Sequence, residues 1–213
     1  MSQLLNLMNL DPYILGPRGR RVYLNHPDFE LLPKEQLLDE IAFGLSRTFR
    51  FSGHTRKLYT VAQHCELVRQ IRLINPLGSL IHDASEAYLG DIAKPLKGNL
   101  PDYQQIEDRF QKSIETALGV DSGDYHSADL TAMIIEMDQL SFGSAAYFGE
   151  AQQVPEIYRL RAEPFLRYVW TPDEAYHGFL HAWSIAQLGG NAANYIDWGT
   201  TENPTVRSGV LVR

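Results

Sequence analysis

The fold of this chain is decided by the stretch Leu80-Ile81-His82-Asp83-Ala84-Ser85-Glu86-Ala87-Tyr88-Leu89-Gly90-Asp91. It places two metal-binding side chains, His82 and Asp83, next to each other in a segment that is otherwise typical of a buried helix. We expect one helix over Leu77–Leu89, with Gly90 as its left-handed C-terminal cap. Neighbouring side chains on a helix point about 100° apart. The pair can therefore hold one ion only if other elements supply further ligands.

Two other segments offer such ligands. His64 lies on a predicted preceding helix, in Tyr59-Thr60-Val61-Ala62-Gln63-His64-Cys65, and Asp138 lies in the apolar helical stretch 134–140. Taken singly, a half-buried histidine is more often structural than a ligand, whereas a buried carboxylate such as Asp138 is costly without a partner. Two imidazoles and two carboxylates together suit one divalent ion, which we expect to be Mn²⁺, Co²⁺, Zn²⁺, Ni²⁺, Fe²⁺ or Mg²⁺.

Length and composition set limits on the class of protein. A chain of 213 residues with 44% hydrophobic content can bury one sizeable core, so we expect one domain over residues 1–190 and a tail over 191–213. A net charge of −7 argues against a nucleic-acid partner, which needs a dense basic face. The single cysteine, the absence of a membrane-length apolar run and the absence of a secretory signal indicate a cytoplasmic protein without a membrane partner.

Apolar periodicity predicts helices along most of the chain, and therefore an all-α fold. The expected helices cover residues 34–45, 61–74, 77–89, 102–118, 128–141 and 172–188. Residues 144–170 are expected to be irregular or in short helices, because Pro155 and Pro164 interrupt them. The tail is predicted to be either disordered or an arm on a partner subunit.

Several motifs follow one another in the first two thirds of the chain. They are Phe49-Arg50-Phe51-Ser52-Gly53-His54 leading into 59–64, then 82–88, and then Gly90-Asp91-Ile92 through Pro95-Leu96-Lys97. Over residues 34–141 they resemble the HD-domain metal-dependent phosphohydrolases, in particular the 5′-deoxynucleotidases and the phage dATP triphosphohydrolases. The resemblance implies an all-α HD-domain helical bundle with a C-terminal helical extension, in which the metal ligands are His64, His82, Asp83 and Asp138.

The resemblance also implies roles for residues around the ligands. Glu86 and Asp91 match the acidic catalytic residues beside the metal-bound water and the leaving group. Arg50 and Lys97 match residues that contact phosphate, and Phe51 stands where these enzymes often have a tryptophan near the sugar or base.

The residues themselves support part of this assignment. Glu86 lies one helical turn after His82, so it can reach a water on the same metal. An exposed helix carboxylate is the alternative for Glu86, and a simple turn residue is the alternative for Asp91. His54 in the basic loop and Lys94 after the predicted metal helix are further candidates for substrate binding, because positive charge there would neutralise a phosphate.

Three departures from the family pattern narrow the expectation. Gln63 stands where the family commonly has glutamate, and Ser52 replaces the first glycine of a Gly-Gly-His loop. Ala87 follows Glu86 where guanosine-tetraphosphate hydrolases usually have aspartate. Ala87 favours a simple nucleotide as the substrate, and the comparison with cyclic-dinucleotide HD enzymes, which use additional histidines for a second metal, favours one metal ion.

Motifs and resemblance together predict a metal-dependent phosphohydrolase that acts on deoxynucleotides by attack of metal-bound water on phosphorus. Whether the substrate is a monophosphate or a triphosphate stays open, as does the base. The alternative is a non-catalytic regulatory protein that binds nucleotides, and a nuclease is disfavoured by the acidic charge. Relatives of this size commonly assemble, so a homo-oligomer is expected.

Overall fold

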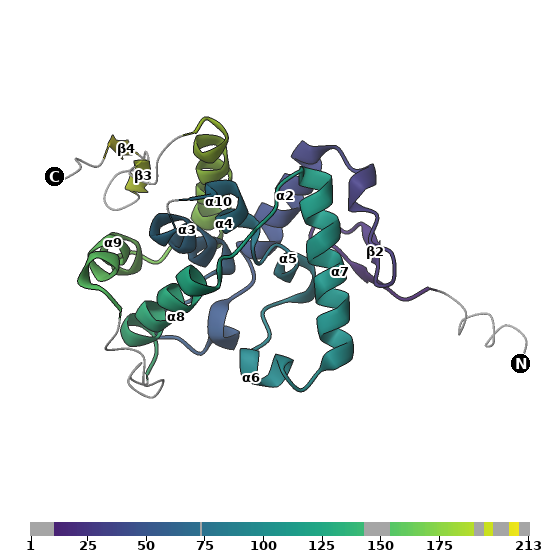
Figure 1. Cartoon of the computed structure of the whole chain (residues 1–213), viewed down its shortest axis with the longest axis horizontal. Coiled ribbons are helices and arrows are strands. Elements are labelled where there is room, and N and C mark those ends of the chain that lie inside the picture. Colours follow the sequence, from purple (N-terminus) through teal and green to yellow (C-terminus); the bar gives the residue numbers. More distant parts are fainter. Residues whose placement is uncertain (1–10, 73, 143–153, 190–193, 198–204, 209–213) are drawn as a thin grey trace, which may run out of the picture.

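The structure is a computed structural model of the chain, and it describes residues 11–72, 74–142, 154–189, 194–197 and 205–208. Helices form most of this described part, which confirms the predicted all-α class (Figure 1). The longer helices are α2 (Lys34–Leu45), α3 (Val61–Ile71), α7 (Pro101–Leu118), α8 (His126–Leu140), α9 (Glu156–Arg167) and α10 (Pro172–Gln187). The shorter ones are η1 (Phe29–Leu31), η2 (Arg50–Gly53), α4 (Pro76–Ile81), α5 (Glu86–Leu89) and α6 (Lys94–Lys97).

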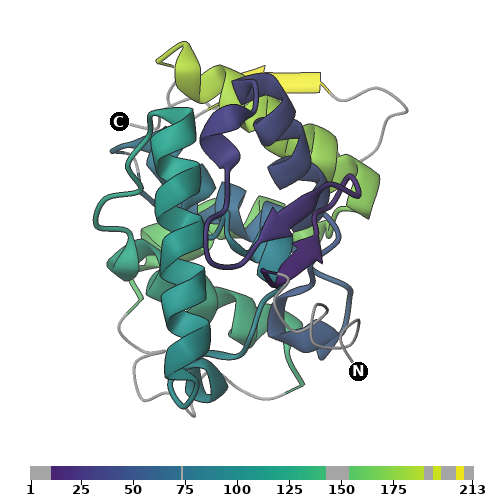
Figure 2. The ribbon, with the colours of Figure 1, turned by 90° about the vertical axis from the view of Figure 1, so that its right-hand side faces the viewer.

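Two antiparallel hairpins accompany the helices. Strand β1 (Tyr13–Leu15) pairs with β2 (Arg21–Tyr23) beside α7, as the turned view in Figure 2 shows. Strand β3 (Asn194–Asp197) pairs with β4 (Thr205–Ser208). These two described segments of the predicted tail are therefore ordered against each other. Among the described helices, none combines the length and the apolar run that crossing a bilayer requires.

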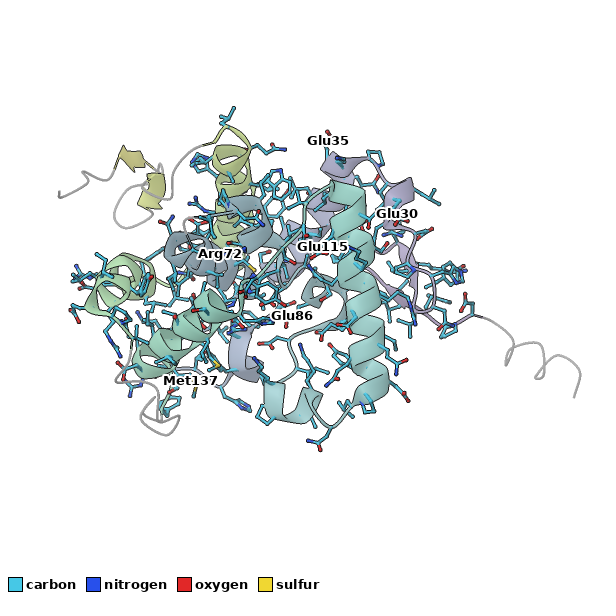
Figure 3. The ribbon with its side chains drawn as sticks, in the orientation of Figure 1. Glu30, Glu35, Arg72, Glu86, Glu115 and Met137 are labelled. Atoms are coloured by element: carbon cyan, nitrogen blue, oxygen red, sulfur yellow. The ribbon has the colours of Figure 1, made fainter. Side chains whose placement is uncertain are left out.

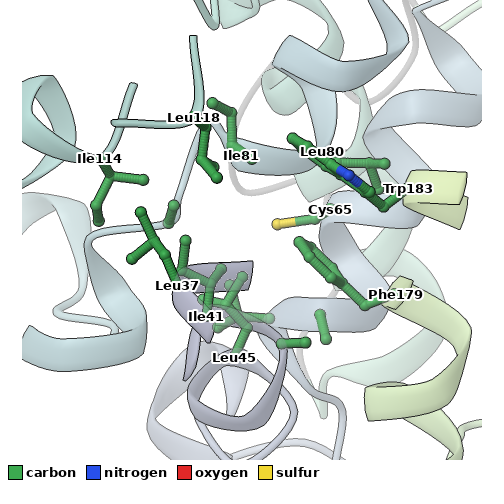
Figure 4. Close-up of a cluster of buried hydrophobic side chains, with 14 of the residues drawn as sticks. Leu37, Ile41, Leu45, Cys65, Leu80, Ile81, Ile114, Leu118, Phe179 and Trp183 are labelled. Carbon is green, nitrogen blue, oxygen red and sulfur yellow. The ribbon is translucent and has the colours of Figure 1, made fainter. Parts of the chain in front are cut away.

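The main core lies where α2, α3, α4, α7 and α10 meet (Figure 4). Its fully or almost fully buried side chains include Leu37, Ile41, Leu45, Cys65, Leu80, Ile81, Ile114, Leu118, Phe179 and Trp183. Burying one such apolar side chain stabilises the fold by about 1.5–3 kcal/mol. Helix α10 is therefore held by the same core as α4, the helix that leads into His82 and Asp83.

Helix α3 separates this core from a second one, and all of its residues are buried. Tyr59, Leu67 and Val68 pack on the other side against apolar residues of α8 and α9. Thr60 caps the helix by accepting a hydrogen bond from Gln63 N at 3.2 Å, as its sequence position predicts. Burial on both sides fixes α3 firmly, and with it the position of every polar side chain that it carries.

The predicted helix over Leu77–Leu89 is wrong as a continuous element. It is divided into α4 and α5 by a turn over His82–Ser85. Gly90 has a positive φ of 80°, but its ψ of 160° is extended, so it turns the chain away from α5 instead of forming a left-handed cap. Residues 156–167 were expected to be irregular or in short helices, yet they form the single helix α9.

Candidate metal centre

Two imidazoles face one another in the interior of the molecule. His64, on α3, is fully buried, and His82, at the start of the turn after α4, is 2% exposed. His64 Nδ1 donates to Glu136 Oε1 at 2.7 Å, and His82 Nδ1 donates to Ser79 O at 2.8 Å. Within the described residues, neither Nε2 atom has a hydrogen-bond partner. An imidazole whose Nδ1 is held in this way, and whose Nε2 makes no hydrogen bond, has the form of a metal ligand.

Two carboxylates complete the cluster. Asp83 Oδ2 lies 3.2 Å from His82 Nε2 and 3.5 Å from His64 Nε2. Asp129 Oδ1, from α8, lies 3.3 Å from His64 Nε2. One ligand atom each of His64, His82 and Asp129 lies within 4.8 Å of the others, a spacing that can hold a metal ion. The structure thus brings together three of the four predicted ligands, with Asp129 as the fourth.

The structure does not bring Asp138, the fourth predicted ligand, to the cluster. Its side chain is 46% exposed and accepts from Arg159 Nη1 at 3.1 Å. Asp138 follows Asp129 by nine residues, which at about 100° per residue places the two on opposite sides of α8. Asp129 and Glu136 are seven residues apart, so both face α3. This spacing is a usable signal in the sequence. However, α8 carries apolar residues on several faces, so the sequence alone does not indicate which face points inward.

The cluster is charged as well as buried. Burial and the Arg50 charge oppose protonation of His64, but Glu136 and Asp129 outweigh them and raise its pKa to about 10. Burial likewise opposes protonation of His82, while Asp83 raises its pKa to about 9. Burial disfavours the ionised forms of Asp83 and Asp129, yet the imidazoles hold both carboxyl pKa values below the usual range. A cation that binds here replaces protons as the charge that neutralises these carboxylates.

Arg50 lies against the same carboxylates. It is 9% exposed, and its Nη2 donates to Glu136 Oε2 at 3.3 Å. Its Nη1 is 3.9 Å from Asp83 Oδ2, and Nη2 is 4.0 Å from Asp129 Oδ1. Burial opposes its charge, but these carboxylates, Glu136 foremost, raise the guanidinium pKa further. Arg50 therefore lies beside the cluster as a permanently charged guanidinium.

A tight loop places Arg50 in this position. Arg50 N donates to Tyr59 O at 2.9 Å, which ties the loop back onto the start of α3. Phe51 and Ser52 both have φ of 55°, and Gly53 has φ of 74°, so three successive residues are left-handed. Ser52 thus adopts a backbone shape that usually favours glycine. The Phe51 ring lies 5.3 Å from the Arg50 guanidinium, beside the cluster.

Glu86 is the buried acid next to the ligands. It is 4% exposed, and Figure 3 shows it in the middle of the molecule. Its Oε1 is 3.6 Å from Lys97 Nζ, whereas Oε2 is buried without a hydrogen-bond partner among the described residues. Burial and the charges of Asp83 and Asp91 raise the Glu86 pKa well above its usual value, against the influence of Arg50 and Lys97.

The predicted substrate-binding residues differ in their surroundings. Lys97 Nζ is paired at 2.6 Å with Glu107 Oε1, so its charge is shared between two glutamates. Asp91 is partly buried, while His54 and Lys94 are exposed and lie outside the group of buried side chains. The structure therefore brings Arg50, Phe51 and Lys97 near the cluster, and does not bring in His54 or Lys94.

Besides Asp129, the site contains two further residues that the sequence motifs do not predict. Glu136 is fully buried and contacts both His64 and Arg50. Tyr125 places its ring centroid 4.8 Å from that of His82, and burial with the Asp83 and Asp129 charges raises its pKa to about 12. A buried glutamate in an apolar stretch was a signal for Glu136. Nothing in the local pattern distinguished Tyr125.

Comparisons with known proteins give relatives of undetermined activity. The chain is 31% identical over 160 residues to the uncharacterized protein YfdR of Escherichia coli K12, an alignment covering 73% of this chain and 87% of the relative. It is 29% identical over 178 residues to the uncharacterized protein RCAP_rcc00048 of Rhodobacter capsulatus, covering 72% of this chain and 89% of that protein. No sequence profile of a known family matches the chain.

Proposed function

We propose that this chain, which belongs to the same family as the uncharacterized protein YfdR of Escherichia coli, is a metal-dependent phosphohydrolase acting on deoxynucleotides. One observation carries the proposal. The buried Nε2 atoms of His64 and His82 make no hydrogen bond within the described part of the chain, and they lie 3.2–3.5 Å from carboxylate oxygens of Asp83 and Asp129. The resemblance of the surrounding motifs to HD-domain phosphohydrolases supports the choice of reaction.

The donor set fits a divalent transition metal ion. His64 and His82 would supply two nitrogens, and Asp83 and Asp129 two oxygens. This mixture suits Mn²⁺, Fe²⁺, Co²⁺, Ni²⁺ or Zn²⁺ better than it suits Ca²⁺, which is bound by oxygen ligands. When bound, such an ion acts as a Lewis acid that activates water and polarises a phosphoryl group. The outer contacts to Glu136 and Ser79 O orient the imidazoles for this role.

The remaining residues supply charge and a proton. Arg50 is permanently ionised beside the cluster and would stabilise the negative charge that develops on phosphate. Glu86, whose raised pKa favours the protonated acid, would donate its proton to the nucleoside oxygen as the bond from phosphorus to that oxygen breaks. Water supplies the new oxygen on phosphorus, and Glu86 regains a proton from it.

The test is release of phosphate from deoxynucleotides. Deoxynucleoside monophosphates and triphosphates are incubated with the protein and Mn²⁺, Co²⁺ or Mg²⁺, and orthophosphate and tripolyphosphate are measured separately. We expect Asp129→Asn to lower turnover by about 10- to 100-fold, because it replaces a charged ligand with a neutral amide. Asp138→Asn, on the opposite side of the same helix, is the matched control and should stay within about twofold of wild type.

Three outcomes would contradict the proposal. The first is no turnover of any deoxynucleotide with any of the ions. The second is equal loss in both aspartate variants, or loss in Asp138→Asn alone. The third is tight nucleotide binding without phosphate release, which would favour the regulatory binding protein instead.

A further inference from the structure

The turn that carries His82 and Asp83 exists because one hydrogen bond of a continuous helix is replaced by a side chain. In an α-helix, Ser85 N would donate to Ile81 O four residues earlier. Here Ser85 N donates to Gln111 Oε1 at 3.1 Å, and Gln111 Nε2 donates to Ile81 O at 2.7 Å. The amide of Gln111, which projects from α7, thus stands between the two backbone groups and satisfies both.

The backbone around this insertion is wound differently from an α-helix. Ala84 N donates to Ile81 O at 3.0 Å, Glu86 N to Asp83 O at 3.0 Å, and Ala87 N to Ala84 O at 3.2 Å. Each of these bonds spans three residues, as in a 3₁₀ turn, and tightens the chain. A side chain inserted into the ladder of backbone bonds is a recognised cause of such a break.

The break has a direct effect on the two ligands that it contains. Neighbouring side chains of an unbroken helix diverge by about 100°. In the turn, His82 Nε2 and Asp83 Oδ2 approach to 3.2 Å, while His82 Nδ1 turns back to Ser79 O. The same turn sets the start of α5, and so the place where Glu86 enters the interior.

Gln111 is itself held in one orientation. Its Nε2 also donates to Glu115 Oε1 at 3.3 Å. Glu115 lies one turn further along α7 and is labelled in Figure 3. Glu115 Oε1 in turn accepts hydrogen bonds from the backbone and the hydroxyl of Ser122. Because a carboxylate can only accept, it keeps the NH₂ end of Gln111 toward Ile81 O and the oxygen toward Ser85 N.

We infer that Gln111 is a positioning residue of the metal centre, whose amide holds the helix open so that His82 and Asp83 converge on one ion. The inference rests on the proposed function, since it concerns the same ion. It assigns a role in metal binding to a residue on α7, which contributes no ligand to the cluster. Its effect acts through the turn, and it touches neither the ion nor the substrate.

The experiment measures Mn²⁺ affinity of the full chain by isothermal titration calorimetry, without any substrate. Gln111→Met keeps the length and removes both hydrogen bonds, and we expect it to weaken Mn²⁺ binding by about 10- to 100-fold. Gln105→Met is the matched control, because Gln105 is exposed on the same helix. Thr171→Ala is a second control, since it weakens the N-terminal cap of α10 and lowers stability without removing a contact of the cluster or of Gln111.

A second variant guards against loss of folding. Gln111→Glu keeps the oxygen that accepts from Ser85 N and loses the donor to Ile81 O, so its Mn²⁺ affinity should lie between those of wild type and Gln111→Met. Hydrogen exchange at the Ser85 amide should accelerate in Gln111→Met, which removes its acceptor, and change less in Gln111→Glu, which keeps an acceptor oxygen. Both controls should leave it unchanged. General destabilisation would not give this pattern, and Thr171→Ala, which only lowers stability, tests this.

The outcomes separate this inference from the proposed function. If wild type binds Mn²⁺ and the soluble Gln111 variants bind it within about twofold of wild type, the positioning role is overturned while the metal centre stands. Equal weakening in Thr171→Ala would likewise overturn it. If wild type itself binds none of the divalent ions, the proposed function fails first, and with it the basis of this inference.

Discussion

At the scale of single residues, Glu136 connects the candidate metal ligands to their surroundings. Its two oxygens accept from His64 Nδ1 and from Arg50 Nη2, and the side chain is fully buried. Burial opposes ionisation of Glu136, but the charges of His64 and Arg50 hold its pKa below the usual range. A single carboxylate therefore orients an imidazole and neutralises a buried guanidinium at once.

Replacing Glu136 should damage both tasks. Glu136→Gln leaves Arg50 without its nearest buried counter-charge, which should lower the free energy of unfolding by a few kcal/mol, roughly 3–5. It should also weaken Mn²⁺ binding by about 10-fold or more, because His64 loses a charged partner. Chemical denaturation and calorimetry give the two values.

The matched control for that substitution is Glu66→Gln. Glu66 is also buried and accepts from Arg69 at 2.6 Å and 2.7 Å, but it belongs to a separate ion pair on α3. It should lower stability to a similar extent and leave Mn²⁺ affinity unchanged. Loss of affinity in both variants would show that the effect is indirect.

Glu86 allows a second test at this scale. If it donates a proton to the leaving nucleoside, Glu86→Gln should lower turnover of a deoxynucleoside monophosphate by about 10²- to 10⁴-fold. It should affect p-nitrophenyl phosphate far less, because nitrophenolate leaves without a proton. Equal losses on both substrates, measured as kcat under saturating conditions, would remove the proton-donor role.

At the scale of elements, the approach of α2 to α5 sets the place of Glu86. Gly44 of α2 lies so close that a Cβ there would be 2.5 Å from Ala87 O and 2.7 Å from Ala87 Cβ. Contacts below 3.0 Å with a backbone atom cannot be relieved by a side-chain rotation. Glycine at this position therefore allows two helices to touch next to the acid of the site.

Gly44→Ala should consequently push α5 away from α2. We expect it to lower stability by about 1–3 kcal/mol through overpacking, and to lower turnover because Glu86 moves with its helix. Gly98→Ala is the control, since a Cβ there would meet Lys94 O at an ordinary 3.6 Å. Thermal unfolding and the phosphate assay on both variants check this, and an unaffected Gly44→Ala would contradict the packing argument.

At the scale of the whole molecule, the candidate ligands come from three separate elements. His64 is on α3, His82 and Asp83 are in the turn between α4 and α5, and Asp129 is on α8. An ion held by all three would link them only in the folded state. Binding should therefore stabilise the entire fold, because the unfolded chain does not assemble the ligands.

The expected gain can be measured by thermal unfolding. Mn²⁺ at 100 times its Kd should add about 2.7 kcal/mol, or roughly 5–10 °C in Tm for a chain of this size. Asp129→Asn should lose this shift, and Asp138→Asn should keep it. A shift of equal size in both variants would mean that the ion binds elsewhere.

The sequence allowed much of this arrangement to be predicted, for physical reasons. Helix periods and caps are local, so the bounds of α2 and the start of α3 follow from nearby residues, whereas α3 ends at Ile71, three residues before the predicted end. The break after α4 does not follow from nearby residues, because its cause is Gln111, more than twenty residues further along the chain. Asp138 lies among apolar residues and matches the family motif, but α8 is apolar on several sides, so which of its carboxylates faces inward depends on tertiary packing.

The depth of the imidazoles has a kinetic consequence. His64 and His82 are sealed from solvent, whereas the side chains of Asp83 and Asp129 are 18% and 24% exposed. An arriving ion would meet the carboxylates first and shed its hydration water stepwise before reaching nitrogen. Departure would follow the same route in reverse, so a chelator in the surrounding buffer should remove the ion slowly, at a rate set by stepwise release from the two buried nitrogens and not by the chelator's own strength.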